Sequence, residues 1–394
     1  MGQYCKGWGA MRSSQEEIKK YSKDFLYLLC CAVNDLTPEQ SRVRLMNPEI
    51  MMNLADLHGV SAMTSYALYK SGLGGDFRAQ WKQTMDQSQR KAALYEIERQ
   101  SIRRYCKQER IRYMFLKGHL MQQYYPVYGM REMSDIDILA EQNARPLLQA
   151  FLSACGYTME EIGESNHDAY HREPFFNVEV HVGLFRPELE PVFTEYYRDI
   201  FDRLIPGEGT EQHFSKEDFY IYHILHAVKH LHYGGIGVKA LTDICLLLRK
   251  ETGLDWTYIA EETKKISVED DEKLLRRTAQ KVFSPLAVSE GYQLTAEEEG
   301  CLLYILESGA YGTMDHYVSD RLSEHKENGK ATGRSKLRYL KGRLYPLQDT
   351  YREMYPFFYH HKWAFPFLPF YRLLRAVRGG RDSILEEIKA LKNS

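Results

Sequence analysis

The stretch REMSDIDILA, residues 131–140, carries two aspartates separated by one residue. Asp135 and Asp137 alternate with apolar residues as in a β-strand, so both carboxylates share one face and are rooted about 7 Å apart. Like charges this close need solvent or a cation. Two such carboxylates can hold divalent metal ions, an arrangement that stabilises displacement at phosphorus. The alternative is a half-buried strand whose polar face carries two acids.

The stretch VEVHV, residues 178–182, shows the same alternation. Its valines point one way, and Glu179 and His181 point the other way. A neighbouring strand could therefore bring a third carboxylate to the aspartates. Alternatively, Glu179 and His181 are ordinary solvent-facing residues.

A glycine turn lies in FLKGHLMQQYYP, residues 115–126. A strand is predicted to end at Lys117 and Gly118, where a helix begins, and the backbone N–H groups of such a turn suit a phosphate. A plain strand-to-helix turn explains the same residues.

Three histidines, His223, His226 and His230, fall on one face of a predicted helix. They could bind zinc, but no acid or cysteine ligand accompanies them nearby in the sequence. Packed, hydrogen-bonded histidines are therefore the favoured interpretation.

The elements that would position these residues divide the chain into three parts. Helical patterns cover residues 14–111, including one long polar helix from Phe77. Short β-rich runs follow, with a helix between two of them that ends at Gly156. Helical spacing returns at Ser215, which with Asp218 forms a start like a capping box. We predict a helical N-terminal region at 1–110, a core at 111–214 and a helical C-terminal domain at 215–394.

The order of strand, glycine turn, helix, DxD strand and a further strand with one acid resembles the core of the polymerase β-like nucleotidyltransferase superfamily. The blocks LKGHLMQQYY, RxxxDIDIL, VEVHVGLF and HAVKH, with LTDICLLL downstream, more closely resemble a bacterial family of uncharacterised nucleotidyltransferases. The resemblance runs from about residue 50 to the C-terminal arginine-rich helix. It implies an α+β fold, with a mixed sheet flanked by helices between a helical N-terminal region and a helical C-terminal domain.

The resemblance also implies roles for the acidic residues. Asp135 and Asp137 would bind the catalytic Mg²⁺ or Mn²⁺ ions, and Glu179 would hold one metal and help to deprotonate the attacking group. Gly118 matches the glycine of the superfamily's Gly-Ser turn. His119 stands where that turn has serine, and Lys117 is the expected replacement contact to the triphosphate of an NTP substrate.

The resemblance assigns the second helix face to nucleotide binding as well. His226, Lys229 and His230 fall on its HxxKH block, and Lys229 could pair with the β- or γ-phosphate. Arg131 would either touch a phosphate or make a structural ion pair. Asp243 would be either a ligand or the buried partner of one of the histidines.

The composition sets limits on partners. The chain has 394 residues with 52 basic and 54 acidic side chains, so no global field draws it to nucleic acid or membrane. Its apolar stretches are shorter than the roughly 20 residues that cross a bilayer. Without the apolar core of a signal peptide, we expect a cytoplasmic protein with no membrane partner. Basic clusters at 334–343 and 372–381 are either solvated faces or a rim that guides nucleotide or nucleic acid.

We therefore expect a metal-dependent nucleotidyltransferase that moves a nucleoside monophosphate from an NTP to a hydroxyl or amine. The sequence leaves the acceptor open between a small molecule, a peptide and RNA. The active site would lie between the sheet and the C-terminal helices. The alternatives are an RNA-directed nucleotidyltransferase of toxin type and a non-catalytic nucleotide-binding protein that retains the fold.

Overall fold

A computed structural model describes residues 15–161, 166–187, 189–232 and 235–310, together with positions 361, 367 and 368. The basic clusters at 334–343 and 372–381 lie outside the described residues.

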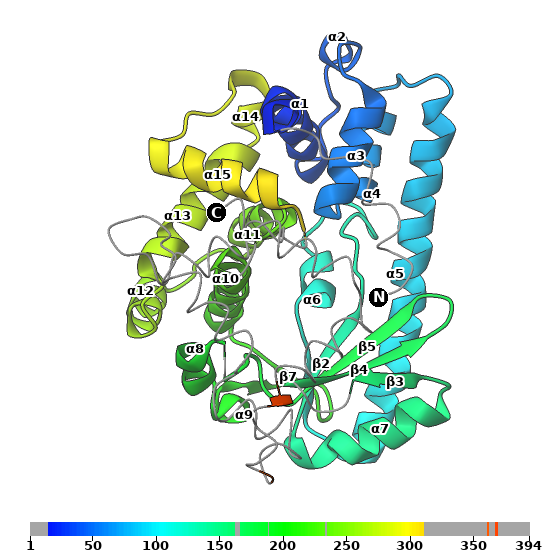
Figure 1. Cartoon of the computed structure of the whole chain (residues 1–394), viewed down its shortest axis with the longest axis vertical. Helices are drawn as coiled ribbons and strands as arrows, with labels where there is room; N and C mark the ends of the chain where they lie inside the picture. Colours follow the sequence, from blue (N-terminus) through cyan, green and yellow to red (C-terminus); the bar gives the residue numbers. More distant parts are fainter. Residues whose placement is uncertain are drawn as a thin grey trace.

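Helices form the first part of the chain, as the sequence predicts. The α3 helix shows why they form where they do: the Asn47 side chain accepts hydrogen bonds from the first-turn N–H groups, and Gly59 ends the helix with a φ of 61°. The α5 helix runs from this helical region down to the sheet (Figure 1). The bounds are α1 Gln15–Val33, α2 Gln40–Val43, α3 Pro48–His58, α4 Ser61–Lys70 and α5 Phe77–Gln108.

A five-stranded mixed sheet follows, in the order β1-β2-β5-β4-β3. The β2 and β5 strands are parallel and the other neighbours are antiparallel. The three predicted strands correspond to β1, β2 and β5, whereas β3 and β4 are additional strands with weaker apolar alternation. The bounds are β1 Tyr113–Phe115, α6 Gly118–Gln122, β2 Ile136–Ala140, α7 Arg145–Ala154, β3 Thr158–Glu161, β4 His167–Arg172 and β5 Phe176–His181.

The two faces of this sheet have different chemistry. On one face, Ile136, Ile138, Val178 and Val180 pack in a hydrophobic cluster with residues of α5 and α7. The opposite face carries the alternate residues of β2 and β5, which include the predicted acids. The alternation therefore places the core on one side and a polar surface on the other.

The C-terminal helices begin at α10, whose first turn is capped as predicted: the Ser215 hydroxyl accepts the Asp218 N–H at 3.0 Å. One hydrophobic cluster joins these helices to α1, α3 and α4, and Figure 1 shows α1 beside α14 and α15. The remaining bounds are α8 Pro191–Tyr196, α9 Ile200–Arg203, β6 Ile205–Pro206, β7 Gln212–His213, α10 Lys216–His232, α11 Lys239–Lys250, α12 Trp256–Lys265, α13 Glu269–Phe283, α14 Leu286–Glu290 and α15 Ala296–Ser308.

The structure is thus α+β, with a mixed five-stranded sheet among helices. Within the described ranges, no helix is both long enough and apolar enough to cross a membrane.

Candidate active site

Asp137 and Glu179 lie side by side on the polar face of the sheet. The parallel register of β2 and β5 pairs the two residues, so their side chains project from strands about 4.8 Å apart. Asp135 lies just before β2, which begins at Ile136. The structure thus gathers the three carboxylates on one face, as the alternation predicted.

Asp137 is held by nitrogen groups from two directions. Its Oδ1 lies 2.9 Å from Nε2 of His181 and 3.4 Å from Nζ of Lys117, and its side chain is buried. Burial opposes the charge, but Lys117 and His181 hold the pKa of Asp137 well below its usual value. The Asp137 carboxylate is therefore ionised at neutral pH.

The pKa of Asp135 shifts in the opposite direction. Burial and the charge of Asp137 raise it to about 6, although the Ser134 hydroxyl donates to Oδ2 of Asp135 at 2.8 Å. Carboxylates whose surroundings push their pKa values apart are typical of catalytic centres. A bound divalent cation would relieve this crowding of negative charge.

His167, which the sequence did not single out, belongs to the same face. It pairs with His181 in the antiparallel register of β4 and β5. The Nε2 atoms of His167 and His181 lie 3.7 and 3.4 Å from Oε2 of Glu179. The three residues form a group of potential metal ligands whose atoms lie within 4.8 Å of one another. Only the cross-strand register reveals His167, because β4 is a short and largely polar run.

Lys117 occupies the turn between β1 and α6. Its φ of 45° lies in the left-handed region, which costs a residue other than glycine on the order of 1–3 kcal/mol. Burial opposes the charge of its ammonium, but Asp137 and the neighbouring acids raise the pKa of Lys117 above its usual value. Backbone strain that accompanies a lysine beside carboxylates points to a functional site.

His119, two residues further on, packs away from the acids. Its ring meets Phe115 edge-on at 5.8 Å between ring centres. Burial and the charges of Arg99 and Arg103 on α5 lower the pKa of His119 to about 4. The residue that replaces the serine of the superfamily turn thus faces α5.

Arg131 forms a buried ion pair with Asp243 of α11. Its Nε donates to Oδ1 at 2.8 Å and its Nη2 donates to Oδ2 at 2.7 Å. Asp243 Oδ2 also lies 3.7 Å from Nε2 of His223. The structure therefore places Arg131 in a structural pair, and it makes Asp243 the buried partner of both residues.

Arg131 also explains why residue 118 is a glycine. A Cβ built on Gly118 would lie 2.8 Å from Nη1 of Arg131 and 3.2 Å from Cγ of Met133. A side chain at this position would displace the arginine, so the close approach of Arg131 and Met133 favours glycine here.

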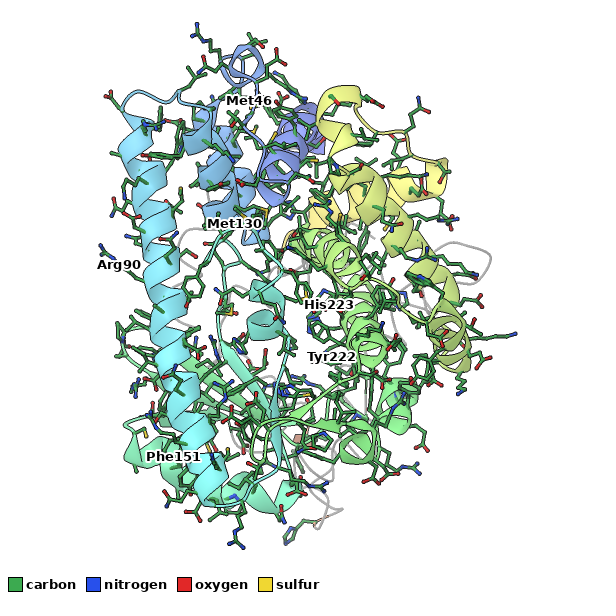
Figure 2. The ribbon with its side chains drawn as sticks, turned by 180° about the vertical axis from the view of Figure 1, so that it is seen from behind. Met46, Arg90, Met130, Phe151, Tyr222 and His223 are labelled. Atoms are coloured by element: carbon green, nitrogen blue, oxygen red, sulfur yellow. The ribbon has the colours of Figure 1, made fainter. Side chains whose placement is uncertain are left out.

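One face of α10 covers the acidic group. Tyr222, His226 and Lys229 follow one another at i, i+4 and i+7, so they share a face, and Figure 2 shows Tyr222 in the middle of the molecule. Burial has the largest effect on the pKa of each of these three side chains. The positive charge of Lys117 acts to lower the pKa of all three. Burial and Lys117 lower the pKa of His226 well below its usual value. The spacing in the sequence could have identified Tyr222 as a neighbour of the site.

His226 and His230 contact each other rather than a metal site. Their Nε2 atoms lie 3.2 Å apart, and burial lowers the pKa of His230 to about 3. In the part of the chain that the structure describes, the group of potential metal ligands is that of His167, Glu179 and His181. His223, His226 and His230 of α10 are thus packed residues beside the acidic group.

Comparison with known proteins gives one match. The model of a family described as "Uncharacterised nucleotidyltransferase" matches residues 46–284, which include every residue of the site described above. No curated protein and no solved structure matches the chain.

Proposed function

Because this match spans more than half of its length, the chain belongs to the family of uncharacterised nucleotidyltransferases, and we propose that it transfers a nucleoside monophosphate from an NTP to a hydroxyl or amine acceptor. Pyrophosphate is the second product. We further propose that the mixed sheet is the polymerase β-like core and that the protein works in the cytoplasm.

The observation that carries this proposal is the pairing of Asp137 with Glu179 on adjacent parallel strands, with Asp135 just before β2 and Lys117 beside them. Carboxylate oxygens are the ligands that Mg²⁺ and Mn²⁺ prefer. The residues present therefore fit a divalent metal, and Asp135, Asp137 and Glu179 would hold it. A metal bound there supplies charge stabilisation for the reacting phosphate.

Basic residues around the acids would hold the triphosphate. Lys117 and Lys229 contribute point charges from the turn and from α10, and Gly118 lets the backbone of the turn approach the nucleotide. His226 and His230, which are also on α10, would line the triphosphate site next to Lys229. Arg131 acts as a positioning residue, because its pair with Asp243 fixes the segment that leads to Asp135.

The reaction forms one bond and breaks one bond at the α-phosphorus. The acceptor oxygen or nitrogen bonds to this phosphorus, and the bond to the bridging oxygen of the pyrophosphate breaks. The acceptor proton passes to Glu179. The transition state is stabilised by groups that are already in place around the phosphate.

The test is pyrophosphate release with each NTP, Mg²⁺ or Mn²⁺, and cell extract as the source of acceptors. We expect activity in the wild type, a loss of at least about a hundredfold in Asp137→Asn, and no loss in the control Asp86→Asn on α5. If wild type and Asp137→Asn behave alike with every NTP, the protein is a binding protein instead. If label from the NTP appears only on RNA, the RNA-directed alternative is correct.

A further inference from the structure

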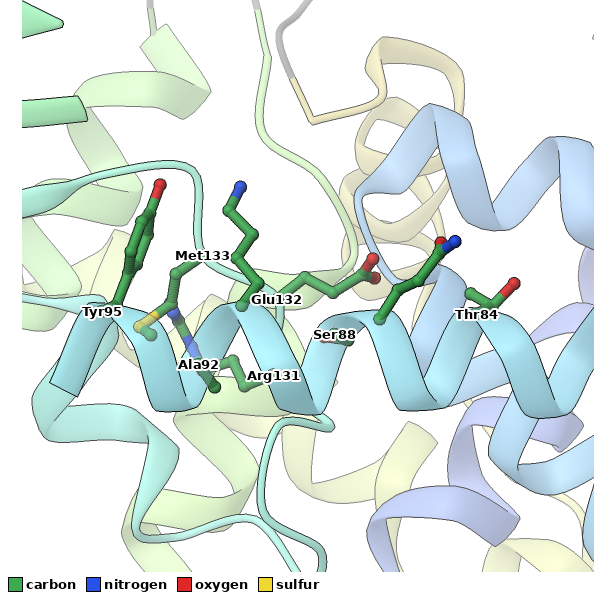
Figure 3. Close-up of a pocket in the computed structure, with 9 residues that line it drawn as sticks. Thr84, Ser88, Ala92, Tyr95, Arg131, Glu132 and Met133 are labelled. Atoms are coloured by element: carbon green, nitrogen blue, oxygen red, sulfur yellow. The ribbon is translucent and has the colours of Figure 1, made fainter. Parts of the chain in front are cut away.

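A pocket of about 220 Å³ lies between α5 and the segment that leads into β2. Its helical wall consists of residues spaced three or four apart, so it is a single face of α5. Figure 3 shows Thr84, Ser88, Ala92 and Tyr95 of this helix together with Arg131, Glu132 and Met133. The residues of the helical wall are Thr84, Gln87, Ser88, Lys91, Ala92 and Tyr95.

The pocket adjoins the acidic group. Met133 of its wall is two residues from Asp135, and the Tyr95 hydroxyl donates to the backbone oxygen of Ser134 at 2.8 Å. The charges of Asp135 and Glu132 act on Lys91. The pocket therefore lies on the α5 side of the sheet and ends within two residues of Asp135.

Two cations line this pocket, and within the described ranges Lys91 is the one that is not held in an ion pair, because Arg131 is paired with Asp243. Lys91 is half-buried, with Nζ 5.3 Å from the ring centre of Tyr95 and 5.7 Å from that of Phe175. Among the described residues it forms no ion pair, and burial lowers its pKa below the usual value. A half-buried ammonium without a counter-ion favours the binding of an anion.

Glu132 does not fill that role. Its Oε2 accepts the backbone N–H of Ala62 at 3.0 Å, at the first turn of α4, and its backbone oxygen accepts from Lys239 at 3.4 Å. The Glu132 carboxylate is thus committed to holding α4. Asp135 is one of the proposed metal ligands, so its charge would be engaged as well.

We propose that this pocket is the acceptor site and that it takes a small, hydroxyl-bearing anion, whose carboxylate or phosphate monoester pairs with Lys91. The inference rests on the proposed function and names its acceptor class. The pocket volume equals about seven molecules of liquid water, which suits a small metabolite. Thr84, Gln87 and Ser88 supply hydroxyl and amide groups that can bind the other hydroxyls of such a molecule.

The charge of Asp135 acts on both Lys117 and Lys91, but their other neighbours differ. Lys117 also interacts with Asp137, with Tyr222 of α10 and with Glu179, whereas Lys91 of α5 also interacts with Glu132. In-line displacement needs the attacking and leaving groups on opposite sides of the phosphorus. In the proposed arrangement, the triphosphate tail lies near Lys117 and the acceptor near Lys91, with the α-phosphorus between them. The acceptor oxygen bonds to the α-phosphorus, the bond to pyrophosphate breaks, and the acceptor proton passes to Glu179.

The test uses three probes that share a three-carbon frame: glycerol, glycerate and glycerol phosphate. Their binding is measured by calorimetry in the presence of Mg²⁺ and a non-hydrolysable NTP analogue, which fills the triphosphate site. We expect saturable binding of at least one anion and none of glycerol. Lys91→Gln should weaken that binding by about tenfold or more, Lys91→Arg should retain it, and the exposed control Lys82→Gln on the same helix should match the wild type.

The inference is overturned if neither anion binds the wild type, if glycerol binds as well as the anions, or if Lys91→Gln binds like the wild type. If only glycerate binds, the anionic group of the acceptor is a carboxylate. If only glycerol phosphate binds, it is a phosphate monoester. Binding of the NTP analogue, measured first, tests the proposed function separately. If the analogue does not bind, that function fails, and the same titrations without it still decide whether Lys91 binds an anion.

Discussion

Arg131 and Asp243 meet through two parallel hydrogen bonds in the interior, 112 residues apart in sequence. Asp243 also accepts the Tyr125 hydroxyl at 2.7 Å, so the pair connects α11 to two points of the chain segment that leads into the acidic strand. The placement of Asp135 therefore depends on α11, whose Lys239 also interacts with the charge of Asp135.

Removal of one member of this pair leaves the other charged and buried. We expect Asp243→Asn and Arg131→Met each to lower the free energy of unfolding by about 3–5 kcal/mol. Urea unfolding at neutral pH measures this loss. Lys82→Met breaks the exposed pair with Asp86 and should cost no more than about 1 kcal/mol. Equal losses in the buried and exposed pairs would contradict the prediction.

The contact between Gly118 and Arg131 predicts the effect of adding one methyl group. Gly118→Ala brings a Cβ to 2.8 Å from Nη1 of Arg131, so we expect a loss of about 1–3 kcal/mol in unfolding free energy and weaker binding of an NTP analogue. The matched control is Gly300→Ala in α15, where no atom lies within 4 Å of the new Cβ. There the helix should gain about 0.5–1 kcal/mol. Equal stabilities of the two variants would show that the close approach is relieved without cost.

The His167, Glu179 and His181 group predicts which metals bind best. Ligand atoms about 2.1 Å from a tetrahedral ion lie about 3.4 Å apart, close to the 3.4 and 3.7 Å separations from Glu179 to the two histidines. Imidazole ligands favour Co²⁺ or Zn²⁺ over Mg²⁺. We therefore expect bound Co²⁺ to show visible absorption.

The histidine variants separate this site from nonspecific metal binding. His167→Gln should weaken Co²⁺ binding by at least about tenfold, whereas His171→Gln on the same strand should leave it unchanged. EDTA should abolish both the absorption and pyrophosphate release. Identical Co²⁺ titrations of the wild type and His167→Gln would rule out imidazole ligation at this position.

His58 predicts a loss of stability in acid. It is fully buried at the end of α3, where its Nδ1 accepts the Val238 N–H at 3.3 Å, and burial lowers its pKa to about 4. In the unfolded chain the pKa is about 6.5, so the unfolded state binds the proton first and stability falls as pH drops between about 6.5 and about 4. The full contribution is about 3 kcal/mol.

Urea unfolding across this pH range checks the prediction about His58. The loss of stability on acidification should be smaller in His58→Gln than in the wild type, and the exposed control His232→Gln should follow the wild type. Parallel pH curves for all three proteins would show that His58 does not carry the effect.

Local sequence determined much of the fold and the polar surface. Alternation in the runs around Asp137 and Glu179 fixed which side chains share a sheet face, because the period of a strand is two. Ser215 marked the start of α10 because its hydroxyl satisfies a backbone donor of the first turn. The division of the chain at residues 110 and 214 stays a prediction, as do the catalytic roles.

Only the tertiary structure decided which distant residues meet. The strand register placed His167 beside Glu179, although its own short strand shows little apolar alternation. The pairing of Arg131 with Asp243, and the pocket of Lys91 beside Asp135, join parts of the chain that are far apart in sequence. Such contacts depend on how whole helices and strands pack, and no local periodicity encodes them.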